Sequence, residues 1–153
     1  MITIRVYGDP APQGSKARGR HGGVYEMSKK VGPWRAAVKL ATETEMDAAA
    51  WQEHELSPGA PVAVTVVFLM ARPAMHYRRG AFAGQLKPGA PSRPATRPDL
   101  DKLVRSTLDG LRMGRAYADD GQVAHLVAEK VYCAAGDQGA MIEIEPCKDG
   151  NAA

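Results

Sequence analysis

The feature that constrains this chain most is an almost continuous apolar run at residues 62–70, which reads VAVTVVFLM. The run is rich in β-branched residues, and Ser57-Pro58-Gly59 precedes it as a break. A short apolar run with such a flank predicts a central strand that is buried on both faces. The rest of the chain must therefore supply neighbouring strands and the helices that cover the sheet.

Three further strands are expected around this one. Residues 2–6 alternate apolar and polar side chains, and Gly8-Asp9-Pro10 ends them, which is the pattern of a half-buried strand. Residues 123–133 and 140–145 predict two more strands near the end of the chain.

Two helices are expected between the strands. Pro33 opens the first at a position where its missing N–H costs nothing, and apolar residues recur at helical spacing to about residue 50. The second covers residues 99–113, with an apolar stripe at three-to-four spacing. The order β-α-β-α-β-β predicts an α/β (α+β) fold, in which a small mixed sheet carries two main helices. The 153 residues should form one domain over residues 1–146 and a polar tail at 147–153.

Two long segments lack periodicity and are basic. Residues 8–32 are rich in Gly and Pro, and residues 71–98 contain six Lys or Arg residues, five prolines and no Asp or Glu. Loops of this length are usually functional or disordered, so we expect residues 71–98 to be mobile alone and ordered on a ligand. Because acidic residues crowd residues 43–55 instead, we expect one cationic face that suits a polyanion.

Several functional classes are disfavoured. Cys133 and Cys147 are too few for a disulfide framework, and neither lies in a CxxC motif or a Cys/His cluster. The Walker pattern GxxxxGK[ST] is absent, so no nucleotide cofactor is expected. No apolar run approaches the roughly 18 to 20 residues that a membrane span needs, and the N-terminus does not read as a signal peptide. We therefore expect a cytoplasmic protein that does not engage a membrane.

Three carboxylates occupy positions that suit metal chemistry. Asp99 and Asp101 lie at the start of the second helix, and Asp120 lies beside Asp119 at the entry to the next strand. Consecutive elements of a small sheet fold are usually neighbours in space, so the three acids are expected to converge. Mg²⁺ prefers oxygen ligands, and two or three carboxylates with phosphate oxygens are enough to hold it. The pattern predicts metal-dependent phosphodiester chemistry.

Asp99 and Asp101 can share an ion only if the helix begins after Asp99. Residues two apart lie about 200° apart around a helix, but on the same side of an extended segment. Pro98 disfavours a helix that runs through Arg97, which agrees with a helix start after Asp99.

Each acid also has a structural interpretation. Asp at the first turn of a helix is favoured by capping and by the helix dipole. Asp101 and Arg105 are spaced for an i,i+4 ion pair, and Asp119-Asp120-Gly121 is a favourable turn sequence. Two acidic clusters beside two basic loops exceed what caps and turns require. The acids are therefore expected either to bind a metal ion or to serve as caps, ion pairs and turn residues.

Residues 97–111, RPDLDKLVRSTLDGL, and residues 118–123, ADDGQV, resemble the signature of the RusA-like Holliday-junction resolvases. The N-terminal strand, Pro12-Gln13-Gly14-Ser15-Lys16 and Trp34-Arg35 are also similar to this family, particularly to its phage-borne members. The likeness spans nearly the whole chain and is weakest over residues 70–92 and the tail. DxD alone is a weak signal, whereas DxDK with a later DDxQV is fairly specific.

The resemblance implies roles for individual residues. The acids expected to bind Mg²⁺, or Mn²⁺ in its place, are Asp99, Asp101 and Asp120. Arg105 stands where the founding member has a catalytic lysine, and Lys102 or Lys130 is expected to share its role. The supporting acids are Asp109 and Asp119. The basic residues expected to contact DNA are Lys16, Arg18, Arg20, Lys29, Lys30, Arg72, Arg78, Arg79, Lys87, Arg93, Arg97 and Lys130.

The resemblance further implies a homodimer that resolves four-way (Holliday) DNA junctions by paired symmetric phosphodiester hydrolysis, in recombination and repair. Symmetric nicks need two sites related by one two-fold axis, which a homodimer provides. A bacterial cell or a phage-infected host is the expected setting. Two alternatives stay open: a junction-binding module of the same fold that does not cleave, suggested by Arg105, and another metal-dependent phosphohydrolase that acts on nucleotides or flap DNA.

Overall fold

A computed structural model describes residues 1–14, 16–18, 24–26, 29–48 and 59–147 of the chain. Its strands are β1 (Ile2–Tyr7), β2 (Lys16–Arg18), β3 (Val24–Glu26), β4 (Val62–Ala71), β5 (Val123–Cys133) and β6 (Gly139–Pro146). Its α-helices are α1 (Val31–Ala48) and α2 (Leu100–Met113), and its 3₁₀ turns are η1 (Ala74–His76), η2 (Gly80–Phe82) and η3 (Asp120–Gln122). The predicted α+β class and the order of the main elements are confirmed.

The sheet is mixed and has the strand order β1-β6-β4-β5. β4 pairs in parallel with β5 and antiparallel with β6, and β6 pairs antiparallel with β1. β4 and β5 are therefore the two strands of a β-α-β unit whose crossover contains α2. This connectivity decides where the acids of the site lie.

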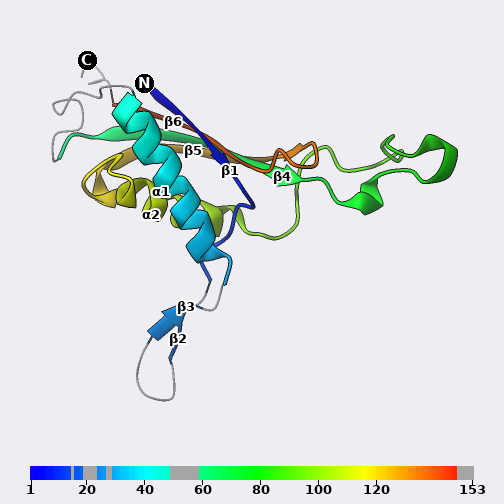
Figure 1. The fold of residues 1–153 in the computed structure, drawn as a ribbon, viewed down its shortest axis with the longest axis horizontal. Coiled ribbons are helices and arrows are strands. Elements are labelled where there is room, and N and C mark those ends of the chain that lie inside the picture. The colour runs from blue at the N-terminus through cyan, green and yellow to red at the C-terminus, as the bar shows by residue number, and fades with distance from the viewer. Residues whose placement is uncertain (15, 19–23, 27–28, 49–58, 148–153) are drawn as a thin grey trace, which may run out of the picture.

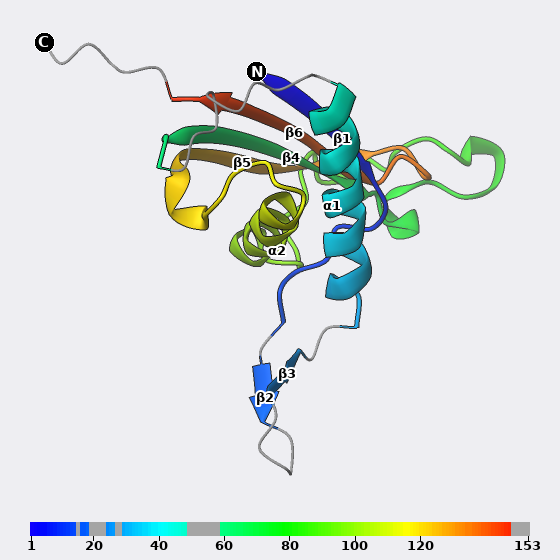
Figure 2. The same cartoon turned by 60° about the vertical axis from the view of Figure 1, so that its left-hand side comes forward.

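Both helices cover the same face of the sheet (Figures 1 and 2). Trp34 and Val38 of α1 pack with Leu103 and Leu111 of α2 onto the buried residues of the strands. Along β4 the burial alternates, because every second residue from Val62 to Phe68 is buried and the residues between them are only partly buried. The prediction that this strand is buried on both faces is wrong, since no helix of the described residues covers the second face.

The helix boundaries differ slightly from those expected. α1 begins at Val31 rather than at Pro33, which lies within the first turn, where a missing N–H leaves no hydrogen bond unmade. α1 ends at Ala48 as described, and residues 49–58 lie outside the described part of the chain. α2 begins after Asp99, as expected.

The predicted loop over residues 8–32 is not continuous loop. β2 and β3 pair antiparallel within it and form a small two-stranded sheet that stands away from the main sheet (Figure 2). Each strand has only three residues, too few to show a period-two pattern in the sequence.

The segment between β4 and α2, residues 72–98, is called the arm here. It projects from the body of the molecule in both views and is drawn in green at the right of Figure 1. The arm has no α-helix or long strand, but it contains η1, η2 and an antiparallel bridge between Tyr77 and Leu86, which the sequence did not predict. Its mobility in the absence of a ligand stays a prediction.

Gly110 lets α1 and α2 pack closely. A Cβ added at Gly110 would lie 2.7 Å from Cβ of Val38 and 3.2 Å from the carbonyl oxygen of Arg35. Gly110→Ala should therefore lower the free energy of unfolding by about 1–3 kcal/mol, even though alanine is the better helix former. Denaturant unfolding measures the change. Gly32→Ala in α1 is the matched control, because its added Cβ would meet nothing within 4 Å; equal stability of the two variants would contradict the packing argument.

Candidate metal and nucleic-acid site

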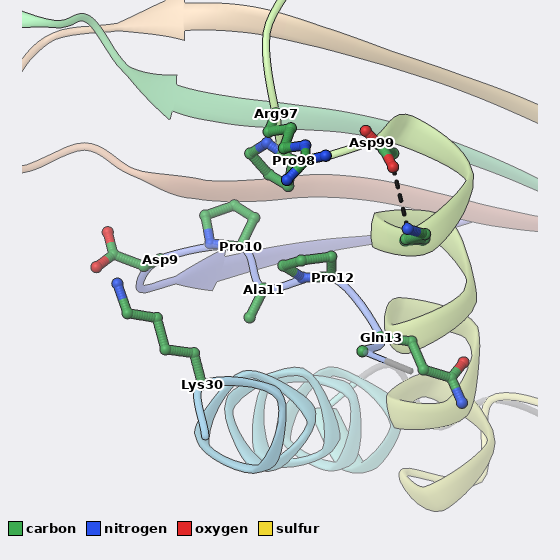
Figure 3. A pocket seen from close by; sticks show the side chains of 11 residues that line it. Asp9, Pro10, Ala11, Pro12, Gln13, Lys30, Arg97, Pro98 and Asp99 are labelled. Atoms are coloured by element: carbon green, nitrogen blue, oxygen red, sulfur yellow. Dashed lines mark ion pairs between the residues drawn. The ribbon is translucent and has the colours of Figure 1, made fainter. Parts of the chain in front are cut away.

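The first turn of α2 presents Asp99. Its backbone is extended, with φ −68° and ψ 136°, and its side chain makes no hydrogen bond to the helix N-terminus. Instead, the Lys102 ammonium lies 3.2 Å from Oδ2 of Asp99 (Figure 3). The interpretation of the Asp99 side chain as a helix cap is therefore wrong. Its half-exposed carboxylate makes no capping hydrogen bond and could bind a metal ion.

The outer surface of α2 carries Asp101 and Arg105, both exposed. The i,i+4 ion pair that their spacing allows is not formed, and neither makes an ion pair with another described residue. Asp109 instead pairs with Arg35 of α1 at 2.6 Å. Together with the Trp34 indole, which donates to Oγ1 of Thr107 at 3.0 Å, this pair fixes the position of α2 against α1.

Asp119 and Asp120 have different structural situations. Asp119 caps η3, because its Oδ1 accepts from the Gly121 N–H at 2.8 Å and the Gln122 side chain accepts from the Asp119 N–H. Asp120 takes no part in this capping box. Its half-exposed carboxylate lies 3.8 Å from Nε of Arg112, in the last turn of α2. Asp119 therefore has the structural role in a turn that its sequence suggested. The carboxylate of Asp120 has no such role and could bind a metal ion.

The three acids do not converge within one chain, and this expectation is wrong. Asp99 lies at the first turn of α2 and Asp120 at its last turn, and a helical rise of 1.5 Å per residue puts about 18 Å between Leu100 and Arg112. No group of three or more His, Cys, Asp or Glu side chains in the described ranges could hold a metal ion.

The parallel pairing of β4 and β5 explains the separation. The two strands run in the same direction and start side by side, with Val62 opposite Val123. The start of β5 and the end of β4 therefore lie at opposite ends of the strands. The arm and Asp99 follow the exit of β4, whereas Asp120 precedes the entry to β5. Consecutive elements do lie side by side, as expected. The segment that carries Asp99 and the loop that carries Asp120 nevertheless lie at opposite ends of α2.

A pocket of about 530 Å³ opens beside Asp99 (Figure 3). It lies between the segment that follows β1 and the first turn of α2, where the Gln13 N–H donates to the Lys102 carbonyl at 3.0 Å. Its lining residues are Asp9, Pro10, Ala11, Pro12, Gln13, Gly14, Lys30, Arg97, Pro98, Asp99 and Lys102. Asp9 and Gln13 were not predicted as site residues, because a strand-ending turn and a Gly-rich loop gave no sign that they line a pocket next to α2.

Lys130 of β5 fixes the segment that leads to Asp99. Its ammonium donates to the carbonyls of Thr96 at 2.8 Å and of Pro98 at 2.9 Å. This side chain was predicted to contact DNA or to share a catalytic role. In the structure, the hydrogen bonds of Lys130 instead fix the backbone next to Asp99.

Part of the predicted DNA-contacting set holds the arm in place. The Arg72 guanidinium lies 4.1 Å from the Tyr132 ring centroid and donates to the Pro91 carbonyl at 2.7 Å, and Arg93 forms an ion pair with Glu129. Within that predicted set, the exposed residues that make no ion pair with a described residue are Lys29, Lys30, Arg79, Lys87 and Arg97. The side chains of Lys16 and Arg18, and all of Arg20, lie outside the described part of the chain.

Tyr117 lies beside the loop that carries Asp120. Burial, with smaller contributions from Asp120 and Asp109, raises the pKa of its hydroxyl far above the usual range. The hydroxyl donates to the Leu108 carbonyl at 3.0 Å. Tyr117 therefore stays protonated and closes the turn after α2, so it cannot act as a base at neutral pH.

The structure thus presents half-exposed carboxylates at both ends of α2, with the exposed side chains of Lys30, Arg97 and Lys102 around the pocket beside Asp99. The family model described as "Endodeoxyribonuclease RusA" matches residues 8–145. The chain belongs to the RusA endodeoxyribonuclease family and is therefore a nuclease. No curated protein matches the chain significantly. Among the described helices, none is long and apolar enough to cross a membrane.

Proposed function

We propose that this protein is a magnesium-dependent endonuclease that resolves four-way DNA junctions as a homodimer, in recombination and repair. The observation that supports the proposal is that Asp99, Asp101 and Asp120, the acids that the resemblance assigns to the metal, are exposed and make no capping hydrogen bond. None of the three is used as a helix cap. Oxygen donors of this kind fit Mg²⁺, and Mn²⁺ is an alternative ion.

The distance between the acids supports a site shared by two subunits. If the α2 helices of two copies lie antiparallel across a two-fold axis, Asp99 and Asp101 of one copy meet Asp120 of the other. The charges along α2 favour this pairing, since Asp101 near one end would face Arg112 near the other. An isologous interface repeats each contact and so creates two equivalent sites, as paired nicks on a two-fold junction require.

Within such a site each side chain has a separate task. Asp99, Asp101 and Asp120 would hold the ion, and a bound divalent ion would polarise the scissile phosphate and lower the pKa of the attacking water. Arg105, exposed on the same surface of α2, is placed to stabilise negative charge that develops on the phosphate. Lys102 restrains the Asp99 carboxylate, and Lys130 restrains the backbone before it.

The proposal is tested with purified protein and four synthetic substrates: a four-way junction, a flap, a duplex and free nucleotides. Each is incubated with Mg²⁺ and without it. We expect symmetric nicks in the junction alone, and only with the metal. A shifted junction that is never nicked would favour a binding module of the same fold, and preferred hydrolysis of flap DNA or nucleotides would favour another phosphohydrolase.

The free cations of the arm should supply affinity without sequence preference. Arg79→Glu combined with Lys87→Glu should weaken binding to all DNA and reduce the slope of log K against log salt by about 2, because two phosphate contacts no longer release counterions. Binding isotherms over a range of salt concentrations measure this. Lys39→Glu on α1 is the control, and slopes equal to that of the unaltered protein would show that the arm does not contact phosphates.

A further inference from the structure

We propose that the tip of the arm is a base-stacking subsite, in which Phe82 and Leu86 contact unstacked bases at the branch point of the DNA. The inference rests on the proposed junction substrate and adds a specific contact to it.

Large apolar side chains are exposed at the arm. Phe82 is 51% exposed, Leu86 47% and Met75 71%. The chain has only two phenylalanines, and the other, Phe68, is fully buried in the core. Exposed large apolar side chains at several places on one projecting segment favour an interaction site over a solvated loop.

The tip is held in a defined shape by its own backbone. The Arg78 N–H donates to the Gln85 carbonyl at 2.8 Å, and the Lys87 N–H donates to the His76 carbonyl at 2.9 Å. η2 forms the turn between these bonds, with Phe82 as its last residue. These bonds give the tip a local shape that presents the ring, so less conformational entropy is lost when a partner stacks on it than on an unstructured loop.

The charge around the apolar residues selects nucleic acid as the partner. The Arg78 guanidinium lies 4.0 Å from the centroid of the Phe82 ring and within 3.4 Å of Oε1 of Gln85. Arg79 and Lys87 flank the tip, and residues 71–98 contain no acid. A flat apolar surface surrounded by cations fits a base and its phosphates, because stacking on aromatic rings and contact with basic side chains are how single-stranded bases are bound.

The root of the arm places the tip in a fixed relation to the site. Tyr132 of β5 contacts Arg72 and lies edge-on to the His76 ring at 5.5 Å. Two residues earlier, Lys130 binds the carbonyls at the end of the arm, next to Asp99. A branch point has bases whose stacking is already interrupted, so inserting apolar side chains there costs less than in continuous duplex.

The test uses a four-way junction that carries a fluorescent adenine analogue at the branch point, with a duplex of the same sequence as comparison. Binding is measured in EDTA, so that cleavage does not interfere. We expect the unaltered protein to raise the emission of the analogue as bases unstack. Phe82→Ala should remove the increase and weaken junction binding at least about fivefold, with duplex binding changed less than twofold, because one stacked base is worth about this factor or more.

Two variants make the result specific. Phe82→Trp should restore both the emission change and the affinity, which a merely misfolded arm would not allow. Leu40→Ala on α1 removes an equally exposed apolar side chain, 66% exposed, and should change nothing. Unchanged emission and affinity in Phe82→Ala, an equal loss on junction and duplex, or an altered oligomeric mass would each overturn the subsite.

Cleavage by the unaltered protein in Mg²⁺ is measured separately. A protein that shows the Phe82-dependent emission change and never nicks the junction would retain the subsite and refute the proposed cleavage of junctions. A protein that nicks the junction with no contribution from Phe82 would do the reverse. Failure to bind a junction more tightly than duplex would overturn both.

Discussion

Asp120→Asn is expected to reduce junction cleavage by at least about a hundredfold, the scale on which the loss of one transition-state contact acts, while junction binding persists. Asparagine keeps the volume of the side chain but removes the charge that an ion needs. The fold should survive, because the only ion pair lost among the described residues is that with Arg112, at 3.8 Å and half exposed. Exposed pairs of this kind contribute about 0–1 kcal/mol.

Gel separation of nicked products and a binding titration on the same junction measure the two quantities for Asp120→Asn. Asp119→Asn is the matched control, since asparagine can still accept the capping bond from the Gly121 N–H. It should retain most of the activity. Undiminished nicking by Asp120→Asn in Mg²⁺ would remove Asp120 from the set of metal acids.

Arg105→Ala should lower the rate constant of cleavage by about 10²- to 10³-fold with little effect on junction affinity. Arg105 makes no ion pair with a described residue, so its removal breaks no observed structural contact. Arg105→Lys should retain much of the rate, because the positive charge remains although the two-pronged hydrogen bonding of arginine is lost.

Single-turnover cleavage with protein in excess separates the rate from affinity in the Arg105 variants. Lys39→Ala, which removes a half-exposed cation of α1 that pairs only with Glu43 among the described residues, serves as the control for overall charge. A cleavage rate in Arg105→Ala equal to that of the control would show that another cation stabilises the charge on the phosphate. Lys102, which lies 3.2 Å from Asp99, would then be the candidate.

The sequence predicted the elements well because their signals are local. The alternation of residues 2–6 and the apolar stripe of α2 each depend on the side chains of one segment, and β1 and α2 form as expected. The start of α2 after Asp99 likewise agrees with Pro98, which disfavours a helix that runs through Arg97. Burial of β4 was overestimated, because an apolar run does not tell how many faces of a sheet are covered.

The arrangement of the site could not be predicted to the same extent. Adjacency of consecutive elements suggested that Asp99 and Asp120 meet, but the direction of pairing between β4 and β5 places them at opposite ends of α2. The structure of the arm depends on contacts with Glu129, Lys130 and Tyr132, which lie more than thirty residues later in the chain. No local pattern in residues 71–98 reports such contacts.

The most direct test of a metal site shared between subunits is complementation between two inactive chains. One chain carries Asp99→Asn and Asp101→Asn, the other carries Asp120→Asn, and each bears a different tag so that the mixed dimer can be purified. If the metal sites are shared between subunits, one of the two sites in the mixed dimer carries all three substitutions. The other site carries none of them. We predict that both parent homodimers are inactive and that the mixed dimer nicks one strand of the junction. A mixed dimer as inactive as its parents would contradict the shared site and place the three acids' action within single chains.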